Sequence, residues 1–345
     1  AYEIAERVAD TDFQLRALCG VWLGSLSIGR HTDAMRSARQ AMAVATDHGK
    51  PEDASAGARM EATLCCLSGE LERARDLSDN ALALYRPSNS QLVRFQFDQK
   101  VATQCLLANI LWLQGFGNDA LDYARRALSH AQAIAHAPSQ FYAVINGAYP
   151  MSIHANDRML ERQCRQILES FTSAHTTWGI WINCFRGLSM IRDGDPRSGV
   201  GFLRAGMAMF PHSALSLRRI PFQVGLIEGL IQSGERAEAS KLLAETLRYC
   251  EDSGERWYMP ELLRFEAEAL IAEDADSAAI TSKLEQSLAE AQKMGARTWE
   301  TRTALTTAEY VRLHQCPTDI ETTPFELEND PARRRGLRKS PLIQT

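Results

Sequence analysis

The sequence lacks the long apolar run that a membrane-spanning helix requires. No stretch of the chain approaches the roughly 18 uninterrupted apolar residues that would cross a bilayer. The first residues, AYEIAERVAD, are acidic and lack the basic and apolar segments of a signal peptide. We therefore expect no membrane partner and no secretion signal.

Cysteine spacing of the kind that marks metal sites or disulfide frameworks is also missing. The eight cysteines form no CxxC pair, and no HExxH or clustered Cys/His pattern is present. Seven of them lie in apolar runs with helical periodicity, where a free cysteine packs as a small hydrophobe. Adjacent Cys65 and Cys66 are the one alternative, a redox pair, although neighbours on a helix point about 100° apart. This usage predicts a reducing cytoplasm, no metal and no cofactor.

Positive charge is not in excess. Lys and Arg number 38 against 43 Asp and Glu, giving a net charge of −5. A surface that grips nucleic acid is normally basic, so direct nucleic-acid binding is not expected. One basic cluster, Arg333 to Lys339, follows an acidic stretch in residues 315–345, and this segment is interpreted as a disordered charged tail.

What the sequence does contain is a repeat. An apolar helical run, a turn of small residues and a charged helix start recur along the chain, as in CLSGELERA and IQSGERAEA. Successive turns are separated by 40, 46, 41, 38, 40 and 40 residues. A fixed period in this range is typical of stacked helical hairpins, because one hairpin alone cannot bury its apolar face. The turn markers are Gly29, Gly69, Gly115, Asn156, Gly194, Gly234 and Asp274.

The predicted fold is all-α: a right-handed α-solenoid of about seven hairpins that resemble tetratricopeptide (TPR) repeats. The period of about 40 exceeds the roughly 34 residues of a TPR unit, so both helices of each hairpin should be longer. Small residues (Ala74, Ala120 and Ala237) are expected where two helices cross. Residues 1–314 form the repeat domain, ending in a capping helix over 296–314. Gly49, Gly254 and Gly295 should end second helices in a left-handed conformation.

The motifs of common enzymes are absent or incomplete. Residues 24–32, GSLSIGRHT, resemble a phosphate-binding loop, but arginine replaces the lysine and a helix replaces the preceding strand. No GxSxG nucleophile elbow is present. The carboxylates from Glu261 to Asp274 fall at helical spacing beside Arg264, which is typical of a solvated helix face, with a catalytic pair as the alternative. The chain is not expected to be an enzyme.

Four amides occupy equivalent positions in consecutive hairpins. They lie ten or eleven residues before a turn, in the middle of a first helix, and are Gln104, Asn146, Asn183 and Gln223. First helices line the concave surface of a solenoid, so this amide column predicts a binding groove, with Tyr142, Trp178 and Trp181 as apolar walls. The alternative interpretation is a hydrogen-bonded ladder of partly buried amides, with the aromatic residues in the core.

Three segments resemble a known family. They are LWLQGFGNDALDYARRALSHAQAI (111–134), SGERWYMPELLRFEAEALI (253–271) and GARTWETRTALTTAEYV (295–311). The chain resembles, over about 100–311, the C-terminal TPR-like region of large bacterial signalling ATPases. Those proteins carry a winged-helix DNA-binding domain, or in relatives an adenylate cyclase domain, before an AAA-type ATPase domain.

The resemblance implies a non-catalytic interaction and sensor module of a bacterial transcriptional regulator. Such a module binds a protein or small-molecule inducer in its concave groove and relays occupancy to a regulatory domain in cis or in trans. The alternative is the accessory repeat region of a signalling enzyme, an adenylate cyclase or an ATPase. A domain upstream of the repeats would separate the two.

Overall fold

The structure, a computed structural model, describes residues 10–48, 51–87, 95–172, 179–209 and 218–314, together with Arg7, and within them it contains helices and the turns that connect them. Gly49, Trp178 and the predicted tail at 315–345 lie outside the described residues. The helices in chain order are α2 (Thr11–Ser27), α3 (His31–His48), α4 (Pro51–Leu67), α5 (Leu71–Leu84), α7 (Gln99–Leu113), α8 (Gly117–Ala133), α9 (Ala137–Ala143), the π-helix η1 (Val144–Ala148), α10 (Tyr149–His154), α11 (Arg158–Thr172), α12 (Gly179–Arg192), α13 (Pro196–Ala208), α14 (Arg219–Ser233), α15 (Arg236–Ser253), α16 (Met259–Ala272), α17 (Ser277–Met294) and α18 (Arg297–His314).

Within these residues the helices pair into seven hairpins, and α18 caps the last one. The pairs are α2 with α3, α4 with α5, α7 with α8, the kinked α9–η1–α10 with α11, α12 with α13, α14 with α15, and α16 with α17. In each hairpin we term the first helix A and the second helix B. The predicted all-α array of hairpins is confirmed, and α18 is the capping helix expected over 296–314.

All seven turn markers adopt the left-handed conformation. Their φ angles lie between 52° at Asp274 and 91° at Gly194. At Gly69 the amide donates to the carbonyl of Cys66 (3.1 Å) and the next amide, of Glu70, donates to Cys65 (2.8 Å). The same pair of bonds recurs at the other six markers. This is the Schellman motif, which supplies donors to the last carbonyls of a helix.

Small residues lie where the two helices of a hairpin cross. They follow the turn by five positions, as at Ala34, Ala74 and Ala120, whose side chains are fully buried. The expected Ala237 is exposed, and the residue at this position in the sixth hairpin is Ala239, with 3% exposure. The predicted period is confirmed, but the small residue of the sixth crossing was placed two residues too early.

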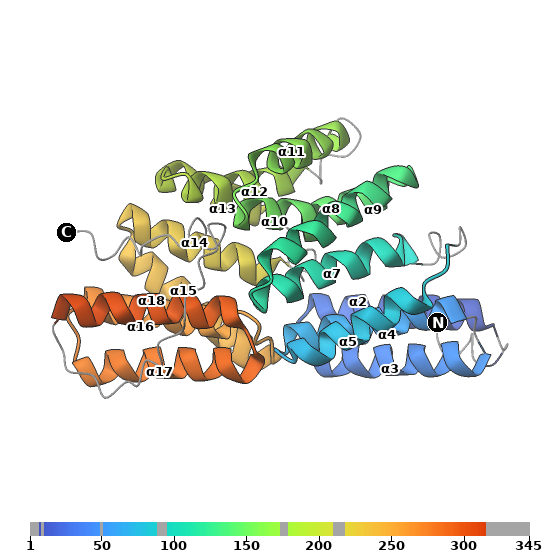
Figure 1. Cartoon of the computed structure of the whole chain (residues 1–345), viewed down its shortest axis with the longest axis horizontal. Helices are drawn as coiled ribbons and strands as arrows, with labels where there is room; N and C mark the ends of the chain where they lie inside the picture. The colour runs from blue at the N-terminus through green and yellow to red at the C-terminus, as the bar shows by residue number, and fades with distance from the viewer. Residues whose placement is uncertain are drawn as a thin grey trace.

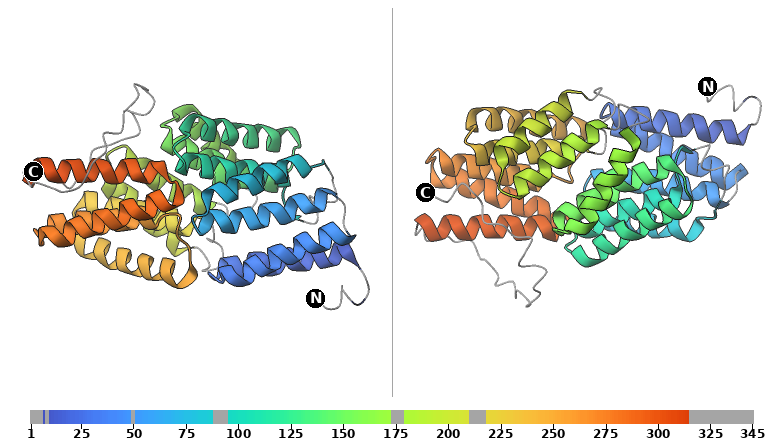
Figure 2. Two further views of the ribbon diagram at one scale, coloured as in Figure 1. Left: turned by 60° about the horizontal axis from the view of Figure 1, so that its bottom comes forward. Right: turned by 90° about the horizontal axis from the view of Figure 1, so that it is seen from above.

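The array curls until its last hairpins meet its first. Figure 1 shows the chain running from α2–α5 at lower right, through α7–α13 above, to α14–α18 at lower left, where the helices end against the first hairpins. The views in Figure 2 show the same arrangement. Contacts between α7 and α18 join segments that are almost 200 residues apart in the sequence.

Backbone and aromatic groups hold this meeting point, which we call the closure junction. The carbonyl of Leu67, at the end of α4, accepts hydrogen bonds from the amides of Arg256 (2.7 Å) and Trp257 (3.1 Å). Thr298 donates its hydroxyl to the carbonyl of Trp112, at the end of α7. The indole of Trp299 packs edge-on against Trp112, with centroids 5.1 Å apart. Carbonyls at the ends of α4 and α7 therefore receive their hydrogen bonds from the other half of the array.

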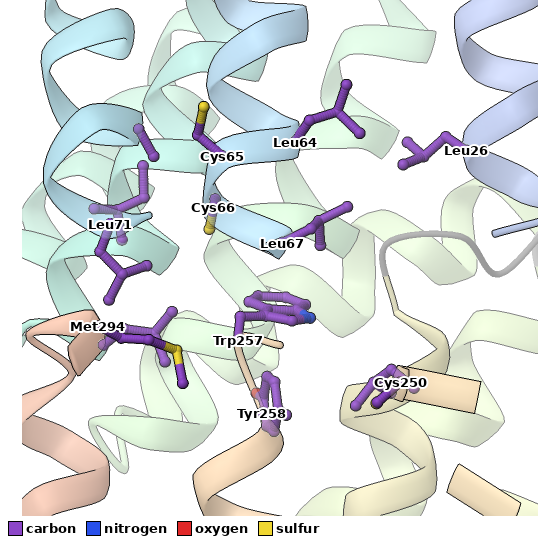
Figure 3. Packing of buried hydrophobic residues seen from close by; sticks show 14 of the residues in the cluster. Leu26, Leu64, Cys65, Cys66, Leu67, Leu71, Cys250, Trp257, Tyr258 and Met294 are labelled. Carbon is purple, nitrogen blue, oxygen red and sulfur yellow. The ribbon is translucent and has the colours of Figure 1, made fainter. Parts of the chain in front are cut away.

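Apolar packing continues across the junction. Figure 3 shows Leu67 and Cys66 of α4 facing Trp257 and Tyr258, with Met294 of α17 beside them. One cluster of buried residues includes members from α2–α4 and from α14–α18. Ile231 and Leu242 also contact the second large cluster, centred on η1 and α12. The two largest clusters of buried residues are thus in contact through α14 and α15.

Candidate functional site

The amide column lies on the A helices, as its spacing predicts. Gln104 is in α7, Asn146 in η1, Asn183 in α12 and Gln223 in α14. Gln104 and Asn146 are 6% exposed and Gln223 is 8% exposed, whereas Asn183 is half-buried. The hydrogen bonds of Asn146 run to residues outside the column. Among the described residues no bond links two of the four amides, so a continuous ladder is not formed.

The aromatic residues expected as groove walls are largely packed. Tyr142 stacks on Phe97, with centroids 4.3 Å apart, and remains half-buried. Trp181 is 8% exposed and lies in a ring cluster with Phe185 and Phe222. Tyr142 and Asn146 line one common cavity, but Gln104, Trp181 and Gln223 do not belong to its lining.

Two of the four amides carry a side-chain oxygen that is enclosed and without a donor. The Oε1 atoms of Gln104 and Gln223 are buried, and no hydrogen-bond donor reaches either of them within the described part of the chain. Buried polar atoms are nearly always paired, so each of these two requires a water or a bound group. The unused hydrogen-bonding capacity therefore lies within the packing of the A helices rather than on their exposed surface.

A proline in the fourth hairpin frees a backbone carbonyl at the centre of the molecule. Pro150 is four residues beyond Asn146 and has no N–H, so the Asn146 carbonyl loses its usual helical donor. The helix opens there into the π-helix η1. Asn109 Nδ2 and Arg218 Nη2 donate to the freed carbonyl, each at 2.8 Å.

Arg218, which caps the start of α14, is the charged member of this cluster. Its side chain is 4% exposed. It donates from Nη2 to Asn109 Oδ1 (3.1 Å) and from Nε to Asn146 Oδ1 (3.4 Å), besides the carbonyl bond. Every one of these acceptors is neutral, so the guanidinium charge is buried against dipoles alone.

A small cavity adjoins these groups. Its volume is about 30 Å³, close to the share of one water molecule in the liquid. It lies on the inner side of the closure junction, between α4, α7, α9, η1 and the segments that precede α14 and α16. Its lining residues are Thr63, Cys66, Leu67, Cys105, Leu106, Asn109, Tyr142, Asn146, Arg218 and Trp257.

A second buried arginine has the opposite surroundings. Arg264 in α16 is also 4% exposed, but it donates to Glu261 (2.8 and 2.9 Å) and forms an ion pair with Glu268. Arg302 of α18 adds a further ion pair to Glu261 at 2.8 Å. Of the carboxylates expected on a solvated helix face, Glu261 and Glu268 are therefore buried, because α18 covers that face of α16, whereas Glu273 and Asp274 are exposed.

A wider cleft opens on the outside of the junction, between α3 and the end of α15. Its volume is about 500 Å³, and His31, Thr32, Arg36 and Arg39 contribute to its lining. The phosphate-loop-like residues 24–32 span the end of α2 and its turn into α3, with no strand before them in the described chain. Gly29 in that turn has a positive φ and ends α2, as the other six turn markers end their A helices.

Asn109, Arg218 and Trp257 are the site residues that sequence reasoning missed. No sequence signal marks Asn109 or Arg218 themselves, because a proline four residues after Asn146 marks only the carbonyl to which they donate. Nothing local marks Trp257, because it reaches the cavity only through the closure.

The described residues contain no group of three His, Cys, Asp or Glu side chains placed to hold a metal ion. In the same residues, every helix falls short of the length or apolar character that crossing a bilayer requires.

No family model and no curated protein matches the chain. Among solved structures, the crystal structure of the P58(IPK) TPR domain aligns over 96% of this chain and 98% of its own, with 15% sequence identity and a TM-score of 0.25. The hairpin architecture rests on the turns and helix contacts of the chain itself.

Proposed function

We propose that the chain is a non-catalytic interaction and sensor module, the repeat region of a bacterial transcriptional regulator. Its A-helix surface would bind a protein or small-molecule inducer and pass occupancy to a regulatory domain in cis or in trans. The observation that carries the proposal is the pair of enclosed amide oxygens on Gln104 and Gln223, because they leave hydrogen-bonding capacity on equivalent inner helices.

The closure junction offers a means of relaying occupancy. A ligand shifts an equilibrium only through different affinities for two states. A ligand bound between A helices would have different affinities for the curled and the opened forms of the array, because the distance between the A helices changes as the ends separate. The regulatory domain would then respond to the position of the first or last hairpin. The resemblance of residues 100–311 to regulator repeats supports this role.

The amide column provides the test through Asn183→Leu. A panel of nucleotides, amino acids, sugars and organic acids is first screened by thermal unfolding of the wild type, and calorimetry then measures each hit. We expect Asn183→Leu to weaken a true ligand by tenfold or more while leaving the melting temperature nearly unchanged. Asn80→Leu, on the exposed face of α5, is the matched control and should change neither quantity.

The opposite pattern would contradict a binding role for the column. If Asn183 is structural, its replacement strands neighbouring polar groups at about 1–3 kcal/mol for each buried group. The melting temperature would then fall with ligand affinity unchanged. Unchanged values for both would remove the column from the proposal, and a panel without hits would remove the small-molecule inducer.

A further inference from the structure

Arg218 lacks a negative partner. No carboxylate forms an ion pair with it anywhere in the described chain, and its hydrogen bonds end on two amide oxygens and one backbone carbonyl. Guanidinium does not deprotonate in proteins, so the charge persists in the buried site. Burying an ion without compensation costs several kcal/mol even after relaxation. Arg264, equally buried, holds two carboxylates.

The titratable groups around Arg218 do not supply the missing charge. They are two thiols, two phenols and the imidazole of His154, whose pKa is lowered to about 3 by burial and by nearby arginines that include Arg218. Burial raises the pKa of Cys66, Cys105 and Tyr142 to about 12 in each case, and burial also raises the pKa of Tyr258. All five are therefore neutral at physiological pH, and the guanidinium faces an environment with no anion of its own.

The cavity beside Arg218 has the size and the donors for a small anion. Its volume of about 30 Å³ exceeds the roughly 10–15 Å³ that one water molecule needs, so a species of the size of chloride fits in it. Tyr142 and Asn146 line it beside the guanidinium, whereas the hydroxyl of Thr63, also in the lining, donates to the carbonyl of Arg59 at 2.9 Å. Arg218 also marks the start of the 15-residue helix α14, whose N-terminal end carries partial positive charge.

We propose that this cavity binds a small monovalent anion of the size of chloride, with the Arg218 guanidinium as its counter-charge. The cavity walls come from α4, from α7 and η1, and from Trp257 in the segment that begins α16. A bound anion therefore joins the first, middle and last parts of the array and stabilises the curled form. The inference is independent of which inducer, if any, binds the A-helix groove.

Thermal unfolding in two sodium salts at matched ionic strength tests the proposal. Chloride or bromide should raise the melting temperature in a saturable manner, whereas gluconate, which is too large for the cavity, should not. At halide concentrations above the dissociation constant of the site, each tenfold rise in halide concentration should lower the unfolding equilibrium constant about tenfold. Arg218→Gln should abolish the difference between the salts. Arg248→Gln, the same exchange at an exposed site on α15, should preserve it.

Crystals soaked in bromide provide a second measurement that needs no variant. The proposal predicts an anomalous peak in the cavity within reach of the Arg218 guanidinium. Tyr142→Phe, which removes one hydroxyl and keeps the ring, should weaken halide binding several-fold and keeps the test valid if Arg218→Gln fails to fold. Equal melting temperatures in both salts, with no bromide peak in the cavity, would mean that water alone solvates Arg218 and would overturn the proposal.

Discussion

The hairpin turns and the closure junction both satisfy backbone groups at helix ends, but they take their donors from different distances along the chain. At the turns, the last carbonyls of each A helix receive amides from the next few residues. At the junction, the carbonyl of Leu67 receives amides from Arg256 and Trp257, and that of Trp112 receives the hydroxyl of Thr298. The first arrangement recurs at every hairpin and the second occurs where the array meets itself.

This difference changes how the stability of the array depends on its individual hairpins. In an open solenoid each repeat contacts only its neighbours, and stability is a sum of local terms. Here hairpins at opposite ends of the chain share a core. A destabilising substitution in the last hairpin should therefore destabilise the first hairpins directly, without first destabilising the middle ones.

Trp299→Ala should have the largest effect on the junction. Its side chain is 1% exposed, packs against Trp112 and Tyr258, and donates from Nε1 to the carbonyl of Trp257 at 2.8 Å. Removing a buried tryptophan costs about 3–5 kcal/mol. Chemical denaturation measures this loss. Leu305→Ala is the control. Leu305 lies on the same helix and is 43% exposed, so its replacement should cost well under 1 kcal/mol.

Glu255 should make the junction sensitive to pH. Burial raises the pKa of this carboxyl to about 7, although Trp257 Nε1 donates to Oε1 at 2.7 Å. Between the ordinary pKa of about 4.5 and 7, the folded state holds a proton that the unfolded state has released, so stability falls as pH rises. The contribution is about 3 kcal/mol.

Glu255→Gln should remove this slope. We expect the variant to be more stable than wild type at pH 8, by up to about 3 kcal/mol, and to lose the advantage towards pH 4. Glu251→Gln, the same exchange at an exposed position on α15, should leave the pH dependence unchanged. A pH profile of Glu255→Gln parallel to that of wild type would show that Glu255 is ionised in the folded state at low cost.

Gly147→Ala tests the middle of the array, away from the junction. A Cβ at Gly147 would lie 2.8 Å from Cys105 Sγ, so either the buried Cys105 side chain or η1 would have to shift. Overpacking of this kind costs about 1–3 kcal/mol. Gly201→Ala is the control, because nothing lies within 4 Å of its Cβ and helix α13 should gain about 0.5–1 kcal/mol. A neutral Gly147→Ala would show that the π-helix is not held by this close approach.

Thr298→Val should have the smallest effect. It removes the hydroxyl that donates to the carbonyl of Trp112 and keeps the shape of the side chain. The expected loss is about 0.5–1.5 kcal/mol. Thr301→Val deletes a hydroxyl whose bond stays inside α18, to the carbonyl of Arg297, and should cost less. Equal losses would mean that the bond across the junction adds nothing to closure.

The repeat could be read from the sequence because its causes are local. A positive-φ residue at the end of each A helix recurs at intervals of 38 to 46 residues, so Gly29 to Asp274 could be placed without a structure. The crossing alanine of α15 was misplaced because Ala237 and Ala239 both fit an alanine-rich pattern. The closure, and with it Trp257 and the neighbours of Arg218, depends on how far the hairpins rotate against one another, and no short sequence pattern encodes that rotation.

Hydrogen exchange of native Trp299→Ala tests most directly whether the two ends of the array are coupled. The closed array predicts a large loss of protection in α4 and at the end of α7, which contact the last hairpin, and little change in α11 in the middle of the chain. A loss that instead declines steadily with distance along the sequence from α18, leaving α4 as protected as in wild type, would contradict closure.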